Sequence, residues 1–287
     1  MPSAIAERII KLRARRKALV GFSDFATDAR AQALDRALKT RWLRLASVLG
    51  AEMSVLAALA GTDKYGQHFY TLVYEKLARA RRRQPVTLLE IGIGGYSKRT
   101  GGESLLMWEA YFRKGRVYGI DLRDKTDLSR GRIKVFQCSQ VDREKLTALA
   151  REIGPFDFII DDGSHVNAHQ IETFRILWPY VKNGGTYVVE DVQTSYWPRF
   201  GGGALGSLAY QRSCMSFFKG LADSVNAPEF LAPPAPDAVI ERQIESVSFH
   251  HNLIVVAKDL FNRVSNFPLE EADTRALLME PAEGAER

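Results

Sequence analysis

The sequence has very little cysteine and lacks long hydrophobic runs. Its 287 residues include two cysteines, Cys138 and Cys214, which lie far apart and form no CxxC pair. A disulfide framework and a thiolate zinc site are therefore not indicated, and a reduced compartment is expected. No apolar run approaches the roughly 18 residues that a membrane span requires, and the N-terminus has no apolar stretch of the secretory kind. We expect a cytoplasmic protein without a membrane partner.

Motifs typical of nucleic-acid enzymes and binding modules are also missing. The sequence contains no zinc-finger or RNP-type motif, and no Asn/Asp-Pro-Pro-Tyr word of the kind found in enzymes that methylate base amino groups. The net charge of +6 originates in residues 1–44, where eleven Lys/Arg face four acids. Such a basic segment can bind nucleic acid or an anionic surface, but it is more often the solvated face of helices. Nucleic acid is therefore not the partner we expect.

What the sequence does contain is a strand–helix–strand unit in which both strands end in acids. The first strand, residues 156–160, runs into Asp161 and Asp162, and the second, residues 186–189, runs into Glu190 and Asp191. Near-continuous apolar runs of this length are typical of parallel strands that are buried on both faces. In open parallel sheets, ligands bind beyond the carboxyl ends of the strands. If the two strands are neighbours, their ends lie roughly 4.8 Å apart, and the acids converge.

An earlier strand, residues 87–91, leads into a glycine loop that reads E-x-G-x-G from Glu90 to Gly94. This loop fits the dinucleotide pattern GxGxxG poorly. The next strand, residues 116–121, ends in Asp121, whose carboxylate is placed to accept hydrogen bonds from ribose hydroxyls. Glu90 would be poorly placed beside a pyrophosphate but well placed near an ammonium group. Together these features favour S-adenosylmethionine over NAD as the cofactor.

Further polar residues extend the predicted cofactor site. A third strand, residues 133–138, ends in Ser139 and Gln140, which suit hydrogen bonds to an adenine edge. The polar loop 61–66 either folds over the ligand or forms a helix cap and turn. The complete predicted cofactor set is Thr62, Tyr65, Glu90, Gly92, Gly94, Ser104, Asp121, Ser139, Gln140 and Asp161.

Asp162, Glu190 and Asp191 are the predicted metal ligands. Hard carboxylate oxygens without a nearby cysteine suit Mg²⁺, and acids crowded at two strand ends would repel one another without a cation. In the simpler alternative these acids cap helices or pair with Lys/Arg. Glu190 and Asp191 are consecutive, so in a regular strand they face opposite ways. Both reach one ion only if the backbone turns there.

His165 follows Asp162 by three residues and is the predicted catalytic base. A neutral imidazole near pH 7 can take the proton of an attacking alcohol, and a metal bound to that alcohol would help. His165 and His169 could share a helix face, which also suggests zinc, but no HExxH is present and Mg²⁺ is favoured. His169 is then a structural residue. In the alternative without catalysis, His165 merely lies at a helix cap.

The remaining segments predict the fold class. Residues 1–60 are expected to be helical, and further helices are expected over 103–112, 142–152, up to Tyr180 and over 205–222. Residues 192–203 suit a mobile acceptor-binding loop, and 241–249 with 253–258 form a closing hairpin. We expect an α/β, doubly wound, Rossmann-like seven-stranded methyltransferase sheet whose last strand is antiparallel. The predicted domains are a basic helical extension (1–60), a class I methyltransferase domain (61–267) and an acidic tail (268–287).

Four words in the sequence carry a family resemblance: GTDKYGQHFY (61–70), LLEIGIGGY (88–96), IDDGSHVNAH (160–169) and VVEDVQTSYWP (188–198). In this order they resemble the metal-dependent sugar O-methyltransferases of macrolide biosynthesis, of the mycinamicin VI 2''-O-methyltransferase type. The resemblance implies an S-adenosylmethionine donor, a Mg²⁺ ion that binds vicinal sugar hydroxyls, a histidine base and a homo-oligomer. Matched by motif, the metal ligands are Asp162, Glu190 and Asp191, and the base is His165. Only about 60 residues precede the core here, fewer than in that enzyme, so the macrolide acceptor is not carried over.

The sequence therefore predicts an S-adenosylmethionine- and Mg²⁺-dependent O-methyltransferase that acts on a sugar hydroxyl of a glycosylated natural product or glycan. Two alternatives stay open. One is an NAD-dependent sugar-modifying enzyme, which the mass of a bound cofactor would reveal. The other is a non-catalytic nucleic-acid-binding module of the same fold, whose salt-dependent binding would survive loss of His165.

Overall fold

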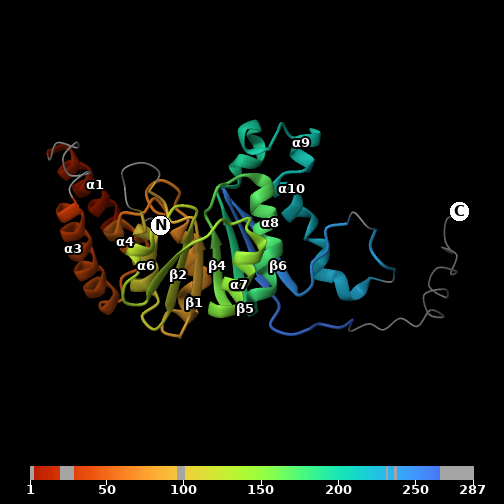
Figure 1. Cartoon of the computed structure of the whole chain (residues 1–287), viewed down its shortest axis with the longest axis horizontal. Helices are drawn as coiled ribbons and strands as arrows, with labels where there is room; N and C mark the ends of the chain where they lie inside the picture. Colours follow the sequence, from red (N-terminus) through yellow and green to blue (C-terminus); the bar gives the residue numbers. More distant parts are fainter. Residues whose placement is uncertain (1–2, 20–28, 96–100, 231, 236–237, 266–287) are drawn as a thin grey trace, which may run out of the picture.

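A seven-stranded sheet forms the centre of the molecule, with strand order β3-β2-β1-β4-β5-β7-β6 (Figure 1). The computed structural model describes residues 3–19, 29–95, 101–230, 232–235 and 238–265. The first five strands are parallel, whereas β7 runs antiparallel to both β5 and β6. The predicted fold class is confirmed. The strands are β1 (Thr87–Ile91), β2 (Arg116–Asp121), β3 (Ile133–Gln137), β4 (Phe156–Asp161), β5 (Val181–Glu190), β6 (Ile244–His250) and β7 (Leu253–Lys258).

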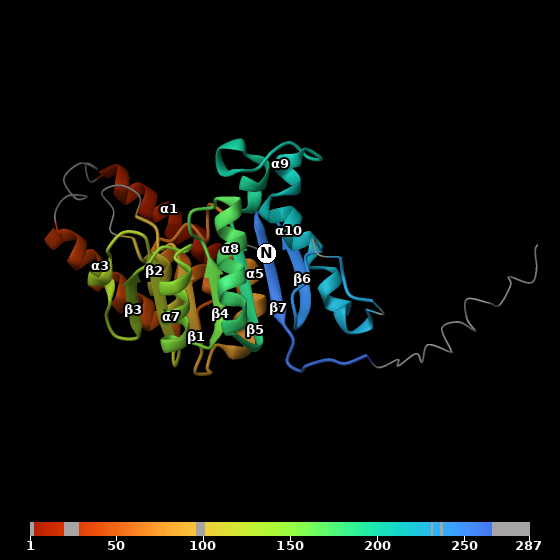
Figure 2. The ribbon, with the colours of Figure 1, turned by 45° about the vertical axis from the view of Figure 1, so that its right-hand side comes forward.

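Helices cover both faces of this sheet (Figures 1 and 2). One face packs against α4 (Met53–Ala60), α5 (Thr71–Ala78) and α6 (Glu103–Tyr111), and the other packs against α7 (Arg143–Ile153), α8 (Asn167–Leu177) and α10 (Cys214–Gly220). Successive side chains of a strand point to opposite faces, so Leu88 joins the first core and Leu89 joins the second. Burial on both faces explains why these strands are apolar throughout.

The expected helices of residues 1–60 are α1 (Ala4–Leu19), α3 (Ala29–Val48) and α4. Both α1 and α3 pack on α4, and α3 also packs on α6. Seven of the eight residues of α4 are buried, so this helix belongs to the main core. The domain boundary at residue 60 stays a prediction, and the acidic tail 268–287 lies outside the described residues. None of the described helices is both long and apolar enough to cross a membrane.

The strand expected over 186–189 begins earlier than predicted and includes Asn183, Gly184 and Gly185. The helix α8 ends at Leu177, a 3₁₀ turn follows, and β5 begins at Val181. Val181 pairs with Phe156 and Thr186 pairs with Phe158, so residues 182–185 bulge out of the pairing. The glycines therefore mark an irregularity within the strand, which is a common role of glycine in sheets.

The prediction of a single helix over 205–222 is wrong. The segment contains two short helices, α9 (Leu208–Gln211) and α10. Ser207 and Ser213 precede them, and each serine hydroxyl accepts a hydrogen bond from a backbone amide three residues later. Each helix therefore has its own N-cap. The 3₁₀ turns are η1 (Arg79–Arg81), η2 (Thr126–Leu128), η3 (Trp178–Tyr180), η4 (Val192–Tyr196), η5 (Pro198–Phe200) and η6 (Asp223–Glu229).

Candidate active site at the carboxyl ends of the strands

The acids predicted to converge do so because β1, β4 and β5 are neighbours in the sheet. Ile91 pairs with Asp161 in β4, and Asp161 pairs with Val189 in β5, so the three strands end at the same level. Gly92 follows β1 with a φ of +77°, and a Cβ atom there would lie 2.1 Å from the carbonyl oxygen of Asp162. Only glycine fits this close approach of the β1 and β4 ends.

A buried lysine lies among these acids. The Lys64 Nζ atom is 2.8 Å from Asp162, 2.7 Å from Glu190 and 3.1 Å from Glu90. The lysine side chain is only 1 % exposed, and those of Glu90 and Glu190 are 0 % and 2 % exposed. The Tyr74 hydroxyl also donates a hydrogen bond to Glu190. The sequence interpretation missed Lys64, although the residue lies in the polar loop 61–66 that was expected near the ligand.

One ammonium group faces three carboxylates in this cluster. Burial lowers the pKa of Lys64, but the attraction of Asp162, Glu190 and Glu90 outweighs burial and holds this pKa well above its usual range. Burial likewise raises the pKa of Asp162, while Lys64 and then His165 oppose the shift. Burial also raises the pKa of Glu190, so the carboxyl groups outnumber the single ammonium group and a further cation would favour their ionised forms.

A more open group lies beside this lysine cluster. Oxygen atoms of Asp162 and Asp191 and a ring nitrogen of His165 lie within 4.8 Å of one another. The His165 Nε2 atom is 3.6 Å from Asp191 and 3.9 Å from Asp162. Their side chains are 16–24 % exposed, so solvent reaches them. The Tyr70 hydroxyl donates to Asp191 at 2.6 Å and orients this carboxylate.

The backbone turn that the sequence interpretation required between Glu190 and Asp191 is present. Asp191 adopts the left-handed conformation with a φ of +55°. Its side chain faces His165 and Tyr70, whereas the Glu190 side chain contacts Lys64 and Tyr74. Of the three predicted metal ligands, Asp162 and Asp191 therefore lie beside His165, and Asp162 bridges to Glu190 through Lys64. This ligand assignment stays a proposal.

Several predicted cofactor residues lie around the β1 and β2 ends. Ser104, near the start of α6, donates from its hydroxyl to Glu90 at 2.8 Å. The Ile93 amide in the glycine loop donates to the Asp121 carboxylate at 3.3 Å. The Lys125 ammonium group lies 2.8 Å from Asp121 and also donates to the carbonyl oxygen of Gly94. The β1 loop and the β2 end are thus tied together at the place expected for the ribose of the donor.

Gln140 and Asp161 form a second part of the predicted cofactor site. The Gln140 side chain donates to Asp161 at 3.4 Å and accepts from the Ser164 amide at 2.6 Å. Burial raises the pKa of Asp161 to about 7, against the hydrogen bonds from Gly163, Tyr187 and Gln140. Ser139, at the β3 end, is half-buried and accepts from the amide of Val141. Gln140 thus links the segment that follows β3 to the end of β4.

The two residues predicted from the loop 61–66, Thr62 and Tyr65, contact their own loop and the core beside α1. Thr62 accepts a hydrogen bond from the Lys64 amide and follows α4, where Gly61 caps the helix. Tyr65 is 3 % exposed and belongs to the core that α1 also joins, and its pKa is raised by burial and then by Glu7 of α1. In this loop, Lys64 rather than Tyr65 reaches the strand ends.

Curated proteins with similar sequences are sugar O-methyltransferases. The chain is 42 % identical over 222 residues to the 8-demethyl-8-alpha-L-rhamnosyl tetracenomycin-C 2'-O-methyltransferase of Streptomyces olivaceus, covering 75 % of this chain and 57 % of the relative. It is 40 % identical over 210 residues to the mycinamicin VI 2''-O-methyltransferase of Micromonospora griseorubida, covering 72 % and 52 %. This chain is a homologue of sugar O-methyltransferases. The chain spans about half the length of the curated homologues it matches. No family model matches the sequence.

Solved structures of a methyltransferase homologue agree with this assignment. The methyltransferase MycE of mycinamycin biosynthesis, in complex with Mg and SAH, superimposes with a TM-score of 0.70 at 37 % identity, over 79 % of this chain and 60 % of MycE. A further MycE complex, which also contains mycinamycin VI, gives a TM-score of 0.66 at 38 % identity, over 72 % of this chain and 54 % of MycE. The resemblance read from the four sequence words is confirmed.

In this O-methyltransferase homologue, Asn167 fixes the segment that follows β5. The segment was predicted as an acceptor-binding loop, and it forms η4 and η5. The Asn167 amide group donates to the carbonyl oxygens of Thr194 and Phe200 at 3.1 and 2.9 Å. Its carbonyl oxygen accepts from the Ser195 hydroxyl at 3.1 Å and from the Cys214 amide at 2.7 Å. One buried side chain thus joins α8, the loop and α10.

Substituting Asn167→Ala should lower the free energy of unfolding by about 2–4 kcal/mol, because it leaves several buried polar groups without partners. Urea denaturation measures this loss. The matched control is Asn183→Ala, whose side chain is exposed and whose replacement should change stability by less than about 0.5 kcal/mol. Equal, small losses for both variants would contradict the role assigned to Asn167.

Proposed function

We propose that this chain transfers the methyl group of S-adenosylmethionine to a sugar hydroxyl of a glycosylated acceptor, in a Mg²⁺-dependent reaction. The observation that carries the proposal is the convergence of Asp162, His165 and Asp191 next to the glycine loop of β1. The acceptor class is supported by the names of the homologues, which modify rhamnosyl and macrolide glycosides. The homo-oligomeric state and the cytoplasmic location stay predictions.

The donor would be held by the ends of β1, β2 and β3. The Asp121 carboxylate, at the β2 end, would accept hydrogen bonds from ribose hydroxyls. Gly92 permits the close approach of β1 to the β4 end. Gln140 and Ser139 would meet the adenine edge, since both carry groups that can donate and accept. Glu90 would act through the bonded network that contains Ser104 and Lys64.

The residues present fit a divalent cation. Asp162 and Asp191 offer hard oxygen atoms that solvent reaches, within a cluster in which carboxylates outnumber ammonium groups. Both Glu190 oxygen atoms accept hydrogen bonds from Lys64, at 2.8 and 2.7 Å, so Glu190 would act as a ligand only after giving up one of these bonds. When bound, Mg²⁺ would orient the acceptor hydroxyl and lower its pKa. His165 Nε2 faces the same carboxylates and is the atom that would take the hydroxyl proton.

The acceptor would lie against the segment after β5. Tyr196 and Trp197 are 43 % and 49 % exposed on this segment, and exposed aromatic rings of this kind suit the apolar face of a sugar or aglycone. Asp162 and Asp191 would stabilise the imidazolium that forms when His165 gains a proton. The chain's own residues thus supply the donor pocket, the base and its counter-charge.

Calorimetric titration of EDTA-treated protein, first with S-adenosylmethionine and then with Mg²⁺, tests the proposal. We expect donor binding by wild type and by Asp162→Ala, and Mg²⁺ binding by wild type only. The control Asp223→Ala replaces an exposed acid and should bind both. Absence of donor binding in wild type would overturn the methyltransferase proposal. The same protein is therefore also titrated with NAD, and binding of NAD alone would favour the NAD-dependent alternative.

Transfer of a labelled methyl group then tests the acceptor class. A panel of rhamnosylated and otherwise glycosylated polyketides should be labelled, whereas the corresponding aglycones should not. Labelling of aglycones at the same rate would contradict the assignment of a sugar hydroxyl as the acceptor.

A further inference from the structure

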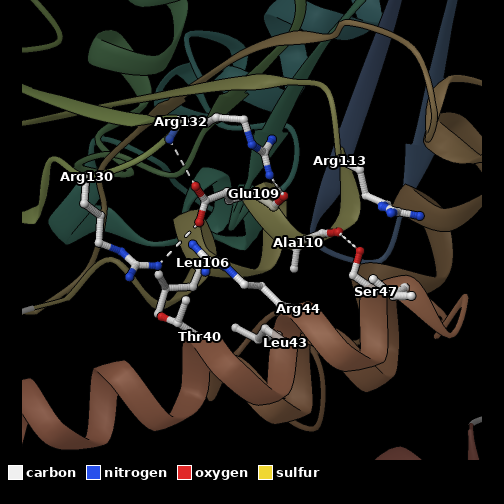
Figure 3. Close-up of a pocket in the computed structure, with 11 residues that line it drawn as sticks. Thr40, Leu43, Arg44, Ser47, Leu106, Glu109, Ala110, Arg113, Arg130 and Arg132 are labelled. Carbon is white, nitrogen blue, oxygen red and sulfur yellow. Dashed lines mark hydrogen bonds and ion pairs between the residues drawn. The ribbon is translucent and has the colours of Figure 1, made fainter.

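A cavity of about 290 Å³ lies between α3 and α6, away from the candidate active site. Figure 3 shows it, with α3 along one side and side chains from the α6 region and the start of β3 on the other. Arg113 and Arg132 lie just before β2 and β3 begin, at the amino ends of these strands. The candidate active site lies at the carboxyl ends, so the two sites occupy opposite edges of the sheet.

Four arginines and one acid line the cavity: Arg44, Arg113, Arg130, Arg132 and Glu109. Glu109 is already engaged, because its carboxylate accepts from the Arg132 backbone amide at 3.1 Å and pairs with Arg130 at 3.4 Å. The Arg132 guanidinium donates to the carbonyl oxygens of Phe112 and Gly115, each at 2.6 Å. Glu109 is the only carboxylate among the described residues that line the cavity, and it therefore balances one of the four positive charges.

Donor groups in this cavity are left without acceptors. Among the residues that the structure describes, the side chains of Arg44 and Arg113 make no hydrogen bond or ion pair. The Arg130 Nε atom is buried and has no hydrogen-bond partner within the same residues. Arg44 extends from α3 into the cavity in Figure 3. Like charges gathered in this way repel one another unless an anion lies between them.

We propose that the cavity between α3 and α6 binds the phosphate group of a small anionic molecule. Guanidinium groups match phosphate oxygens with paired, charge-assisted hydrogen bonds. The volume of about 290 Å³ is near the lower end of small-molecule sites, which suits a compact anion and not a polymer backbone. Because α3 carries Arg44 and the turn between α6 and β2 carries Arg113, a bound anion would hold α3 against α6.

The same chemistry can come from a soluble phosphate compound or from a lipid headgroup. Two apolar residues of α3 that lie close to Arg44 in sequence are exposed, Trp42 at 59 % and Leu45 at 49 %. Such residues could contact a lipid surface. The experiment therefore needs one arm with inorganic pyrophosphate and one with vesicles that contain phosphatidylglycerol. Both arms use the whole chain at constant ionic strength, adjusted with sodium chloride.

Calorimetric titration with pyrophosphate should give saturable binding to wild type and at least about tenfold weaker binding to the double variant Arg44→Gln/Arg113→Gln. Both residues are exposed, so the variant should fold, which circular dichroism checks. The control Arg151→Gln replaces an exposed arginine of α7 and should bind like wild type.

Equal binding by wild type and the double variant would overturn the proposal. It would also be overturned if titration of wild type with pyrophosphate released no more heat than titration with sodium chloride. Tighter binding to vesicles than to pyrophosphate, lost in the double variant, would identify the source of the phosphate as a lipid headgroup. S-adenosylmethionine binding should be unchanged in the double variant, so the outcome is independent of the proposed methyltransferase activity.

Discussion

Replacing Lys64 with methionine is expected to destabilise the fold and to make its stability depend on a divalent cation. The Lys64 ammonium group lies within 3.1 Å of Glu90, Asp162 and Glu190, and Glu90 and Glu190 are buried. Methionine occupies a similar volume but leaves these carboxylates without a counter-charge. Removing one partner of a buried ion pair costs about 3–5 kcal/mol. We expect a loss of this size in the free energy of unfolding, measured by urea denaturation in EDTA at about pH 8.

Two changes of condition should recover part of this loss. Mg²⁺ can supply the missing positive charge, so it should stabilise Lys64→Met much more than wild type. Lower pH should act in the same direction, because burial and then the repulsion from Asp162 raise the pKa of Glu190. A carboxyl group with a raised folded-state pKa stabilises the fold below its unfolded-state pKa, and this stability is lost as the pH rises through the folded-state pKa.

The matched control is Lys258→Met, which removes a second buried lysine. The Lys258 ammonium group donates to the backbone carbonyl oxygens of Trp178 and Val181 at 3.1 and 2.9 Å. Its loss should destabilise the chain without any dependence on Mg²⁺, because carbonyl groups carry no net charge. A Lys64→Met variant that responds to Mg²⁺ no more than this control would show that Lys64 is not the counter-charge of the acids.

The fold and the meeting point of the acids could be predicted because both follow from local patterns. Apolar strands with acids at their carboxyl ends indicate a parallel sheet, and parallel neighbours end at the same edge. The pairing of β4 with β5 then brings Asp162 close to Glu190. The break between α9 and α10 was not predicted, because Ser207 and Ser213 become N-caps only through the hydrogen bonds that their hydroxyls accept from the Tyr210 and Ser216 amides.

Lys64 could not be found in this way because its partners are remote in sequence. Asp162 is 98 positions away and Glu190 is 126 positions away. A lysine in a polar loop is normally solvated, and nothing in its local sequence marks it as buried. The repulsion expected among the acids led to the prediction of a metal ion. In the structure, the Lys64 ammonium group supplies part of the positive charge that offsets this repulsion.

The substitution His165→Gln should lower kcat by about 10²–10⁴-fold, because it removes the group proposed to take the acceptor proton. The His165 Nε2 atom lies between Asp162 and Asp191, at 3.9 and 3.6 Å. The same position would also suit a metal ligand, and Mg²⁺ affinity separates the two roles. If His165 acts as the base, the variant should bind Mg²⁺ and S-adenosylmethionine with dissociation constants within about threefold of wild type. If His165 is a metal ligand, its loss should weaken Mg²⁺ binding at least about tenfold.

His169→Gln provides the control from the same segment. His169 lies one turn further along the chain, and its Nδ1 atom is hydrogen-bonded to the Ser164 hydroxyl at 2.9 Å. Glutamine can keep a hydrogen bond there, so kcat should fall less than about tenfold. Comparable losses in both variants would mean that the loop before α8 is simply disturbed. A large loss confined to His165→Gln, with Mg²⁺ affinity intact, follows only if the imidazole handles the proton and the carboxylates hold the ion.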